Sequence, residues 1–409
     1  MTRVYDLPPP LKRTFVDARG HRTSCLLDFA SGARFDCDAV ADLLAWGHPL
    51  GQRSLLSGVE WALPGSWELS EPSPHPSALG RDARADALWR LLCDAVSRYG
   101  VGRVGVALSG GLDSRAIAAA AVETLPRVGC ATFGDLDAPD LPVARVVARR
   151  LGSSQLVSEL PLEAALFEES RVFEATGGLG GPASAPGAFT DSLWVKDFDV
   201  LLSGMSGDVI WGDTALRGPT PSSRLRKLGA RAAESPLAMV PSPPGWATPA
   251  GIVAWQNLWT RQARVTWNGL LSRRLVMPVH PVLWDPPLVS FCLALDGNDR
   301  GGRSLLRHML TRHAESVSPA VVPAVSGPVH DLNRAMRQSP LWRTELDAML
   351  GARARWDAAG LRPRGVERLL RLVRDGKRPR AGLVSRLRTI WSWSWRLDPG
   401  VGRSNAGLI

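Results

Sequence analysis

Apolar and polar positions alternate in blocks along the middle of the chain and predict its main elements. Residues 101–108 form a compact apolar run of the kind that builds a strand buried on both faces of a parallel sheet. Before this run, apolar residues at helical spacing predict a helix that ends near Gly100, and after it residues 115–122 begin an alanine-rich helix. The predicted order is helix, strand, loop and helix.

The same pattern continues toward the carboxyl end. Residues 128–133 and 198–202 are typical of two more buried strands, and a helix is expected from about residue 142 to residue 151. Strands that alternate with helices at this spacing imply right-handed βαβ crossovers and a parallel sheet. We therefore predict an α/β fold, with a helical region at 251–310 and a mobile loop or lid in the Pro-, Ser- and Arg-rich stretch 215–250.

Composition divides the chain into three predicted units. The first seventy residues are rich in turns and short β-like stretches, and the prolines of the cluster at 71–77 cannot continue a helix or a central strand. A domain boundary is expected there. The units are a small β-rich unit at 1–77, a main domain at 78–345 and a basic Arg/Trp-rich tail at 346–409.

The net charge of +10 belongs to the tail. Residues 351–409 hold fourteen Arg plus Lys against four Asp plus Glu, so the rest of the chain is close to neutral. In the tail, arginines alternate with Leu, Val and Trp, which favours amphipathic helices that pack their apolar side chains on the protein and leave Arg in solvent. The alternative is a basic aromatic patch for RNA, acidic peptide or membrane headgroups. A nucleic-acid partner is not expected.

Several other classes are disfavoured by composition. The five cysteines are scattered and contain no Cys-x-x-Cys pair, and no His-x-x-x-His spacing occurs, so neither a disulfide framework nor a zinc site is indicated. No apolar run reaches the roughly 18 residues that a membrane span needs, and the first residues lack the apolar core of a secretory signal. A cytoplasmic location is expected.

The loop Ser-Gly-Gly-Leu-Asp-Ser at 109–114 carries the clearest chemistry. Its two glycines let backbone N–H groups approach an anion, the serines add hydroxyl donors, and the following helix adds the positive end of its dipole. Asp113 is suited to hold a Mg²⁺ ion that contacts phosphate. Neither a lysine-bearing P-loop nor a Gly-x-Gly-x-x-Gly fingerprint occurs at this loop. The predicted phosphate-binding stretch is Ala107, Leu108, Ser109, Gly110, Gly111, Asp113 and Ser114.

This loop is the signature of PP-loop ATP pyrophosphatases, and the chain resembles their asparagine synthetase branch, which also contains β-lactam synthetases and lasso-peptide cyclases. Residues 133–152 resemble the second strand of that branch and its next helix. Residues 201–212 resemble its element Leu-Leu-Ser-Gly-Glu-Gly-Gly-Asp-Glu-Leu-Phe-Gly, and 277–289 with 303–307 resemble its later signatures. The resemblance spans about residues 80–310 and implies a PP-loop synthetase fold with a helical carboxyl-terminal part.

The resemblance also implies a reaction and a set of site residues. Enzymes of this branch adenylate a substrate carboxylate, release pyrophosphate and let an amine attack the acyl-adenylate. ATP and Mg²⁺ are therefore the expected cofactors, with Asp208 as the second magnesium carboxylate beside Asp113. Arg303 and Arg307 are candidates for neutralising phosphate charge, and Arg115 for support at the loop. The resemblance places Phe133 at the adenine, and the expected nucleotide contacts further include Ser203 and Gly204.

Two positions depart from the pattern of the branch. Met205 stands where its members have a glutamate that positions or deprotonates the attacking amine, and a thioether cannot accept a proton at neutral pH. Between Leu305 and Arg337 the chain has no lysine, although the branch uses one late in the domain to stabilise charge in the transition state. Both departures disfavour ordinary asparagine synthesis.

The amino-terminal unit resembles a shortened glutaminase domain. Residues 55–65 are similar to the end of that domain, which begins in glutamine-using members with a cysteine after the initiator Met. Here position 2 is Thr2, and the first cysteine is Cys25. We therefore expect a truncated unit without glutaminase activity, so that the nitrogen nucleophile is free ammonia or an amine on the substrate.

Three functions remain open from the sequence. The leading one is an ATP- and Mg²⁺-dependent amide ligase, acting on a small-molecule or peptide carboxylate in a specialised pathway, with a peptide-carrier protein as a further candidate partner. The second is a nucleotide-binding pseudoenzyme that serves as an interaction module, favoured by Met205 and by the missing lysine. The third is a tRNA-directed PP-loop enzyme, which the basic tail favours but which lacks a Cys-x-x-Cys pair.

Overall fold

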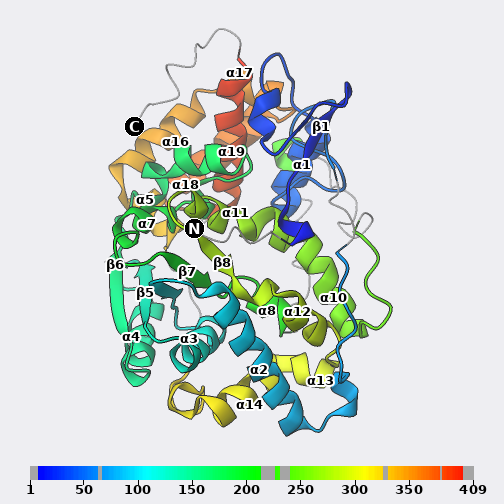
Figure 1. The fold of residues 1–409 in the computed structure, drawn as a ribbon. Helices are drawn as coiled ribbons and strands as arrows, with labels where there is room; N and C mark the ends of the chain where they lie inside the picture. Colours follow the sequence, from blue (N-terminus) through cyan, green and yellow to red (C-terminus); the bar gives the residue numbers. More distant parts are fainter. Residues whose placement is uncertain are drawn as a thin grey trace.

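A five-stranded parallel sheet forms the centre of the computed structural model (Figure 1), which describes residues 8–62, 67–212, 226–230, 240–325, 330–377 and 380–398. Its strand order is β6-β5-β4-β7-β8, and every neighbouring pair is parallel. The α/β fold and the parallel sheet predicted from the sequence are therefore confirmed. The strands are β4 (Val104–Ala107), β5 (Val128–Gly134), β6 (Ser154–Glu159), β7 (Val200–Ser203) and β8 (Val279–Pro281).

The central strand β4 carries the glycine loop at its carboxyl end. Val106 pairs with Cys130 on β5 and with Leu202 on β7, and all three side chains are buried. From β4 the chain adds β5 and β6 on one side and later β7 and β8 on the other. This reversal of direction makes the carboxyl ends of β4 and β7 a switch point, which is where open α/β sheets bind ligands.

Helices pack against the sheet and against each other around this switch point. Helix α2 packs on both α3 and α14 (Figure 1), and α4 packs on β5. None of the helices that the structure describes combines the length and the apolar character of a membrane span. The bounds are α2 (Arg81–Tyr99), α3 (Leu112–Thr124), α4 (Asp140–Arg150), α12 (Pro286–Leu293) and α14 (Ser304–His313).

The region 251–310, predicted as helical, is helical over most of its length but also contains strand β8. This strand has only three residues, too few for an apolar run to reveal it. The remainder holds α10 (Pro249–Asn257), a π-helix (Leu258–Thr266) and α11 (Trp267–Leu271). Of the predicted lid at 215–250, residues 215–225 and 231–239 lie outside the described residues, and so does Thr2.

A small antiparallel sheet lies near the amino terminus. Its order is β2-β1-β3, and Phe15 pairs with Thr23 on one side and with Trp61 on the other. Helix α1 follows the first two strands, and its N-cap Asp36 accepts hydrogen bonds from the next turn of backbone. The bounds are β1 (Phe15–Asp17), β2 (Arg22–Thr23), β3 (Val59–Trp61) and α1 (Cys37–Trp46).

Two hydrophobic cores organise the molecule. The first surrounds the parallel sheet. The second joins the amino-terminal unit to the tail, because Phe15 and Val40 share it with Leu387 and Trp393, and α1 packs against α19 (Ala381–Arg396). The boundaries predicted at residues 77 and 345 remain predictions, but the two ends of the chain are packed into one apolar core.

The tail forms helices whose apolar side chains are buried, as its pattern predicts. Leu370 of α18 (Pro363–Arg374) and Ile390 of α19 are fully buried. The prediction that the arginines lie in solvent holds for Arg362, Arg364, Arg368 and Arg371, which are exposed, but not for Arg388. Arg388 is buried in ion pairs with Glu169 and Glu345, so part of the basic charge of the tail is used inside the fold.

Candidate functional site

The glycine loop connects β4 to α3 and is held in shape by its own serines. The backbone N–H of Ser109 donates to Ser114 Oγ at 3.0 Å, and the two hydroxyl oxygens lie 2.9 Å apart. The N–H of Gly111 donates to Ser109 Oγ at 3.2 Å. The serines therefore order the loop. Among the described residues no side chain caps the start of α3, which leaves backbone N–H groups at this helix end for an anion.

The strand before the loop is anchored to its neighbour. Ala107 is the last residue of β4, and the N–H of Leu108 donates to the carbonyl of Ala131 at 2.9 Å. The carbonyl of Leu108 accepts a hydrogen bond from Thr132 Oγ1, also at 2.9 Å. These bonds fix the direction in which the chain leaves the sheet and enters the loop.

The guanidinium of Arg115 binds backbone carbonyls of the glycine loop and of a distant segment. The side chain is fully buried and donates to the carbonyls of Val317 and Gly110 at 3.0 Å and to that of Val322 at 2.5 Å. Burial lowers the pKa of Arg115, and the charge of Arg307 lowers it further. The predicted support at the loop is thus indirect, because the guanidinium ties the segment 317–325 to the loop through backbone oxygens.

Asp113 and Asp208 come together at the carboxyl ends of β4 and β7. Asp208 lies in the first turn of α8 (Gly207–Ile210). Burial raises the pKa of Asp113, Arg303 and Trp211 oppose that shift, and the charge of Asp208 adds to it. A Cβ atom on Gly207 would lie 2.5 Å from Asp113 Cγ, so only glycine allows this approach. The two predicted magnesium ligands therefore lie near each other.

Arg303 contacts Asp113 directly. Its Nη1 lies 3.1 and 3.2 Å from the two carboxylate oxygens, and Trp211 Nε1 donates to Oδ1 at 2.7 Å. Arg303 holds a left-handed backbone (φ 56°), which is uncommon for a side chain other than glycine and is often found at functional sites. Arg307 is exposed on the next turn of α14 and donates to the carbonyl of Gly302 at 3.0 Å.

The turn after β7 is also strained. Ser206 has φ 71° at the position of a glycine in the motif that residues 201–212 resemble. Its hydroxyl donates to Gln262 Oε1 at 2.9 Å and accepts from Trp284 Nε1 at 3.1 Å. Gly204, which precedes this turn together with Ser203, packs against the loop, because a Cβ there would lie 3.1 Å from the backbone nitrogen of Ser114.

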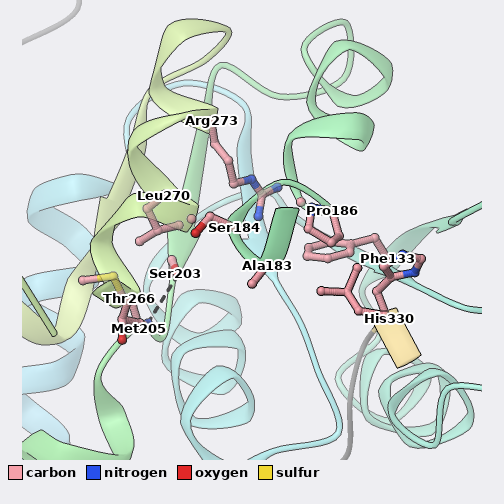
Figure 2. A pocket seen from close by; sticks show the side chains of 13 residues that line it. Phe133, Ala183, Ser184, Pro186, Ser203, Met205, Thr266, Leu270, Arg273 and His330 are labelled. Carbon is pink, nitrogen blue, oxygen red and sulfur yellow. Dashed lines mark hydrogen bonds between the residues drawn. The ribbon is translucent and has the colours of Figure 1, made fainter. Parts of the chain in front are cut away.

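A cavity of about 380 Å³ opens beside this turn, at the carboxyl ends of β5 and β7. Figure 2 shows Met205 on one side of it and His330 beside Phe133 on the other. The guanidinium of Arg273 lies 5.3 Å from the ring centres of both Phe133 and Trp194. Side chains that line the cavity include Phe133, Ser203, Met205, Thr266, Arg273 and His330.

Comparison with protein families decides the class of this fold. The model of the asparagine synthase family matches residues 87–320, which is more than half of the chain. The chain belongs to the asparagine synthase family. Among curated proteins, no sequence matches it significantly. The matched range holds the glycine loop, Asp208 and Arg303, and it ends before the tail.

Membership of the asparagine synthase family supports an ATP-dependent, amide-forming ligase. Enzymes of this family use ATP, typically with Mg²⁺. The site fits both, since the start of α3 offers backbone donors to phosphate, and Asp113 and Asp208 offer hard oxygen ligands. Among the described residues no group of three or more acidic, Cys or His side chains could hold a metal. Phosphate and water oxygens would complete the shell of a Mg²⁺ ion.

Three residues near the asparagine synthase site were missed by the sequence reasoning. Trp211 lies within the recognised motif at 201–212, but an indole donor to Asp113 has no sequence signature. Asp135 lies two residues after the strand predicted at 128–133 and directly after the observed β5, so its place at the edge of the sheet was a usable signal. His330 had no such signal, because it meets Asp135 across 195 positions of sequence.

Proposed function

We propose that this protein is an ATP- and Mg²⁺-dependent ligase that forms an amide through a carboxylate adenylate, without glutaminase activity. Its substrate is a small-molecule or peptide carboxylate. The observation that carries the proposal is the approach of Asp113 and Asp208 at the glycine loop, beside an uncapped helix start. The charge of Asp208 raises the pKa of Asp113, and two carboxylates at this separation are unfavourable together unless a cation joins them.

In the first step, different residues of the site bind phosphate, bind the metal ion and orient one of its ligands. The N–H groups at the start of α3 bind phosphate oxygens, and Asp113 with Asp208 holds the Mg²⁺ ion, which neutralises phosphate charge when bound. Arg303 keeps the carboxylate of Asp113 oriented. A carboxylate oxygen of the substrate then attacks the α-phosphorus, and the bond to pyrophosphate breaks.

The second step forms the amide. The nitrogen of an amine attacks the acyl carbon, the bond to AMP breaks, and the leaving phosphate takes the electron pair. The cavity beside Met205 borders the loop through Ser203 and Gly204, which supports it as the place of the acyl group. The adenine contact of Phe133 remains a prediction, supported by its position in the same cavity.

The nitrogen source is ammonia or an amine of the substrate. Release of ammonia from glutamine needs an activated cysteine, and activation means a lowered thiol pKa. Burial instead raises the pKa of Cys25, and it also raises the pKa of Cys37. These are the cysteines of the amino-terminal unit, and their surroundings support a unit without glutaminase chemistry.

Exchange of labelled pyrophosphate into ATP tests the proposal. The assay would be run with a panel of carboxylates, including aspartate and short peptides that carry Asp or Glu side chains. With an active carboxylate, Asp113→Asn is expected to lower exchange on the order of 10³-fold, because the loss of a magnesium ligand removes several kcal/mol of charge stabilisation. The matched control is Asp199→Asn, which changes an exposed aspartate that pairs with Arg103.

The outcomes separate the candidate functions. Exchange that depends on Asp113 supports adenylation. Tight binding of ATP without exchange on any carboxylate contradicts the ligase and favours the pseudoenzyme, which the missing glutamate and lysine also favour. Exchange that survives Asp113→Asn would show that the two carboxylates do not hold the ion.

A further inference from the structure

The amide-forming step needs a proton acceptor that position 205 cannot supply. An attacking amine must lose a proton, and Met205, which lines the cavity, has a thioether in place of the carboxylate of related enzymes. Among the described residues that line the cavity, only Arg273 and His330 carry an ionisable side chain. A guanidinium has no lone pair that accepts a hydrogen bond, so the imidazole of His330 is the one side chain among them that can act as a base.

His330 is held by a buried carboxylate. Its Nδ1 lies 2.6 Å from Asp135 Oδ1, and the Asp135 side chain is 3% exposed. Asp135 Oδ2 accepts from the backbone N–H of Asp331 at 2.8 Å and lies 2.9 Å from Arg334 Nη2. Both oxygens of Asp135 thus face hydrogen-bond donors, and the contact with Oδ1 is assigned as a donation from Nδ1–H of His330.

This tautomer leaves the other nitrogen of His330 with a lone pair. Nε2 is buried and has no hydrogen-bond partner among the residues that the structure describes. A buried polar atom without a partner is rare in folded proteins and calls for an explanation. His330 lines the cavity beside Phe133 (Figure 2).

We propose that His330 is the catalytic base of the amide-forming step and that Asp135 is its positioning residue. This inference rests on the proposed ligase function. The amine nitrogen forms a bond to the acyl carbon, the bond from that carbon to the AMP oxygen breaks, and AMP leaves with the electron pair. The proton of the amine passes to His330 Nε2. The base lies across the cavity from Met205 (Figure 2), so the amine approaches from the side of β5.

The experiment compares two nucleophiles on one acyl-adenylate. The full chain is supplied with ATP, Mg²⁺ and the carboxylate that gives the strongest pyrophosphate exchange. The first nucleophile is ammonium chloride, or the amine of the same peptide where the carboxylate lies on a peptide. The second is hydroxylamine, which is largely unprotonated at neutral pH and therefore depends little on a base. Amide and hydroxamate are measured by mass spectrometry.

His330→Ala is expected to lower amide formation by about 10²- to 10⁴-fold, the usual contribution of a general base. Pyrophosphate exchange and hydroxamate formation should stay within about twofold, and added imidazole should restore part of the amide rate. Asp135→Asn should lower the amide rate alone, because an asparagine amide can donate to Nδ1 and so favours the wrong tautomer. His308→Ala is the matched control, since its ring pairs with exposed Asp82 at 2.7 Å.

Three results would overturn the inference. An unchanged amide rate in His330→Ala would show that His330 is not the base. An equal loss of exchange, or a raised KM for ATP, assigns His330 to the nucleotide. If hydroxamate formation falls as much as amide formation, His330 only maintains the shape of the cavity. If His330→Ala does not fold, His330→Gln is measured in its place. Absence of exchange in the unaltered protein is a separate result, because it contradicts the proposed ligase itself.

Discussion

Two arginine–carboxylate clusters use the same chemistry in different surroundings. Arg303 pairs with Asp113 at the glycine loop, where their side chains are 27% and 21% exposed. Arg388 pairs with Glu169 and Glu345 in the second core, where each side chain is at most 10% exposed. The first cluster has a left-handed backbone and a second carboxylate nearby. A part-exposed, strained pair can exchange partners with a ligand, whereas a buried pair is fixed.

The buried cluster carries the largest expected effect. Arg388→Met should lower the free energy of unfolding by about 3–5 kcal/mol, because it leaves two buried carboxylates without their cation. Urea unfolding measures the loss. Arg353→Met is the matched control, since Arg353 pairs with Glu367 but is largely exposed, and it should change little. Equal stability of Arg388→Met and the unaltered protein would contradict the view that this pair is fixed.

The same variant should depend on pH with a defined sign. Burial raises the pKa of Glu169, and Arg388 opposes that rise, so its removal raises the pKa further. Between this raised value and the ordinary glutamate value, the folded variant binds more protons than the unfolded chain. Its stability therefore increases as the pH falls through that window. The deficit of Arg388→Met should be largest at neutral pH and should shrink on acidification.

The exposed cluster should respond in activity instead of stability. Arg303→Met is expected to lower pyrophosphate exchange about 10- to 100-fold, the usual effect of removing a group that orients a metal ligand. Its melting temperature should change little, because both partners are part-exposed. Arg312→Met, on the helix that follows Arg303 and paired with Asp86, is the control. A large drop in melting temperature would place Arg303 with the structural arginines.

Pyrophosphate exchange by Arg303→Met should also become more sensitive to low pH. Burial raises the pKa of Asp113, and Arg303 is the main group that opposes this shift. Without Arg303 the pKa of Asp113 rises further, so a larger fraction is protonated at a given mildly acidic pH. Because only the carboxylate binds a cation well, the acid limb of the exchange profile should move to higher pH.

The contrast between the clusters shows which features the sequence could reveal. The strand, glycine loop and helix at the first cluster follow from neighbouring residues, so apolar runs and a glycine pair were enough to predict them. The same holds for the α/β class. The clusters themselves join distant parts of the chain. Arg303 meets Asp113 across 190 positions and Arg388 meets Glu169 across 219, and no local pattern specifies such pairs.

Charge composition misled for the same reason. Counted by itself, the tail has more arginines than acidic residues, because the acidic partners of some of these arginines lie elsewhere in the sequence. Arg388 and Arg396 pair with Glu169 and Glu174, both from the middle of the chain. A count of charges along the sequence therefore overstates the basic surface. Strand β6 was missed for a local reason, since its residues are partly exposed and mostly polar.

The smallest expected effect concerns the strain that marks the first cluster. Ser206 keeps φ 71°, a region that glycine adopts without steric strain. Ser206→Ala and Ser206→Gly both remove the hydroxyl that contacts Gln262 and Trp284, so they differ mainly in backbone freedom. If the turn keeps its shape, the free energy of unfolding of Ser206→Gly should exceed that of Ser206→Ala by about 1 kcal/mol. The difference is measured as a higher urea midpoint for Ser206→Gly. Equal midpoints would mean that the turn relaxes once the hydroxyl is gone, and that the hydroxyl itself enforces the strain beside Asp208.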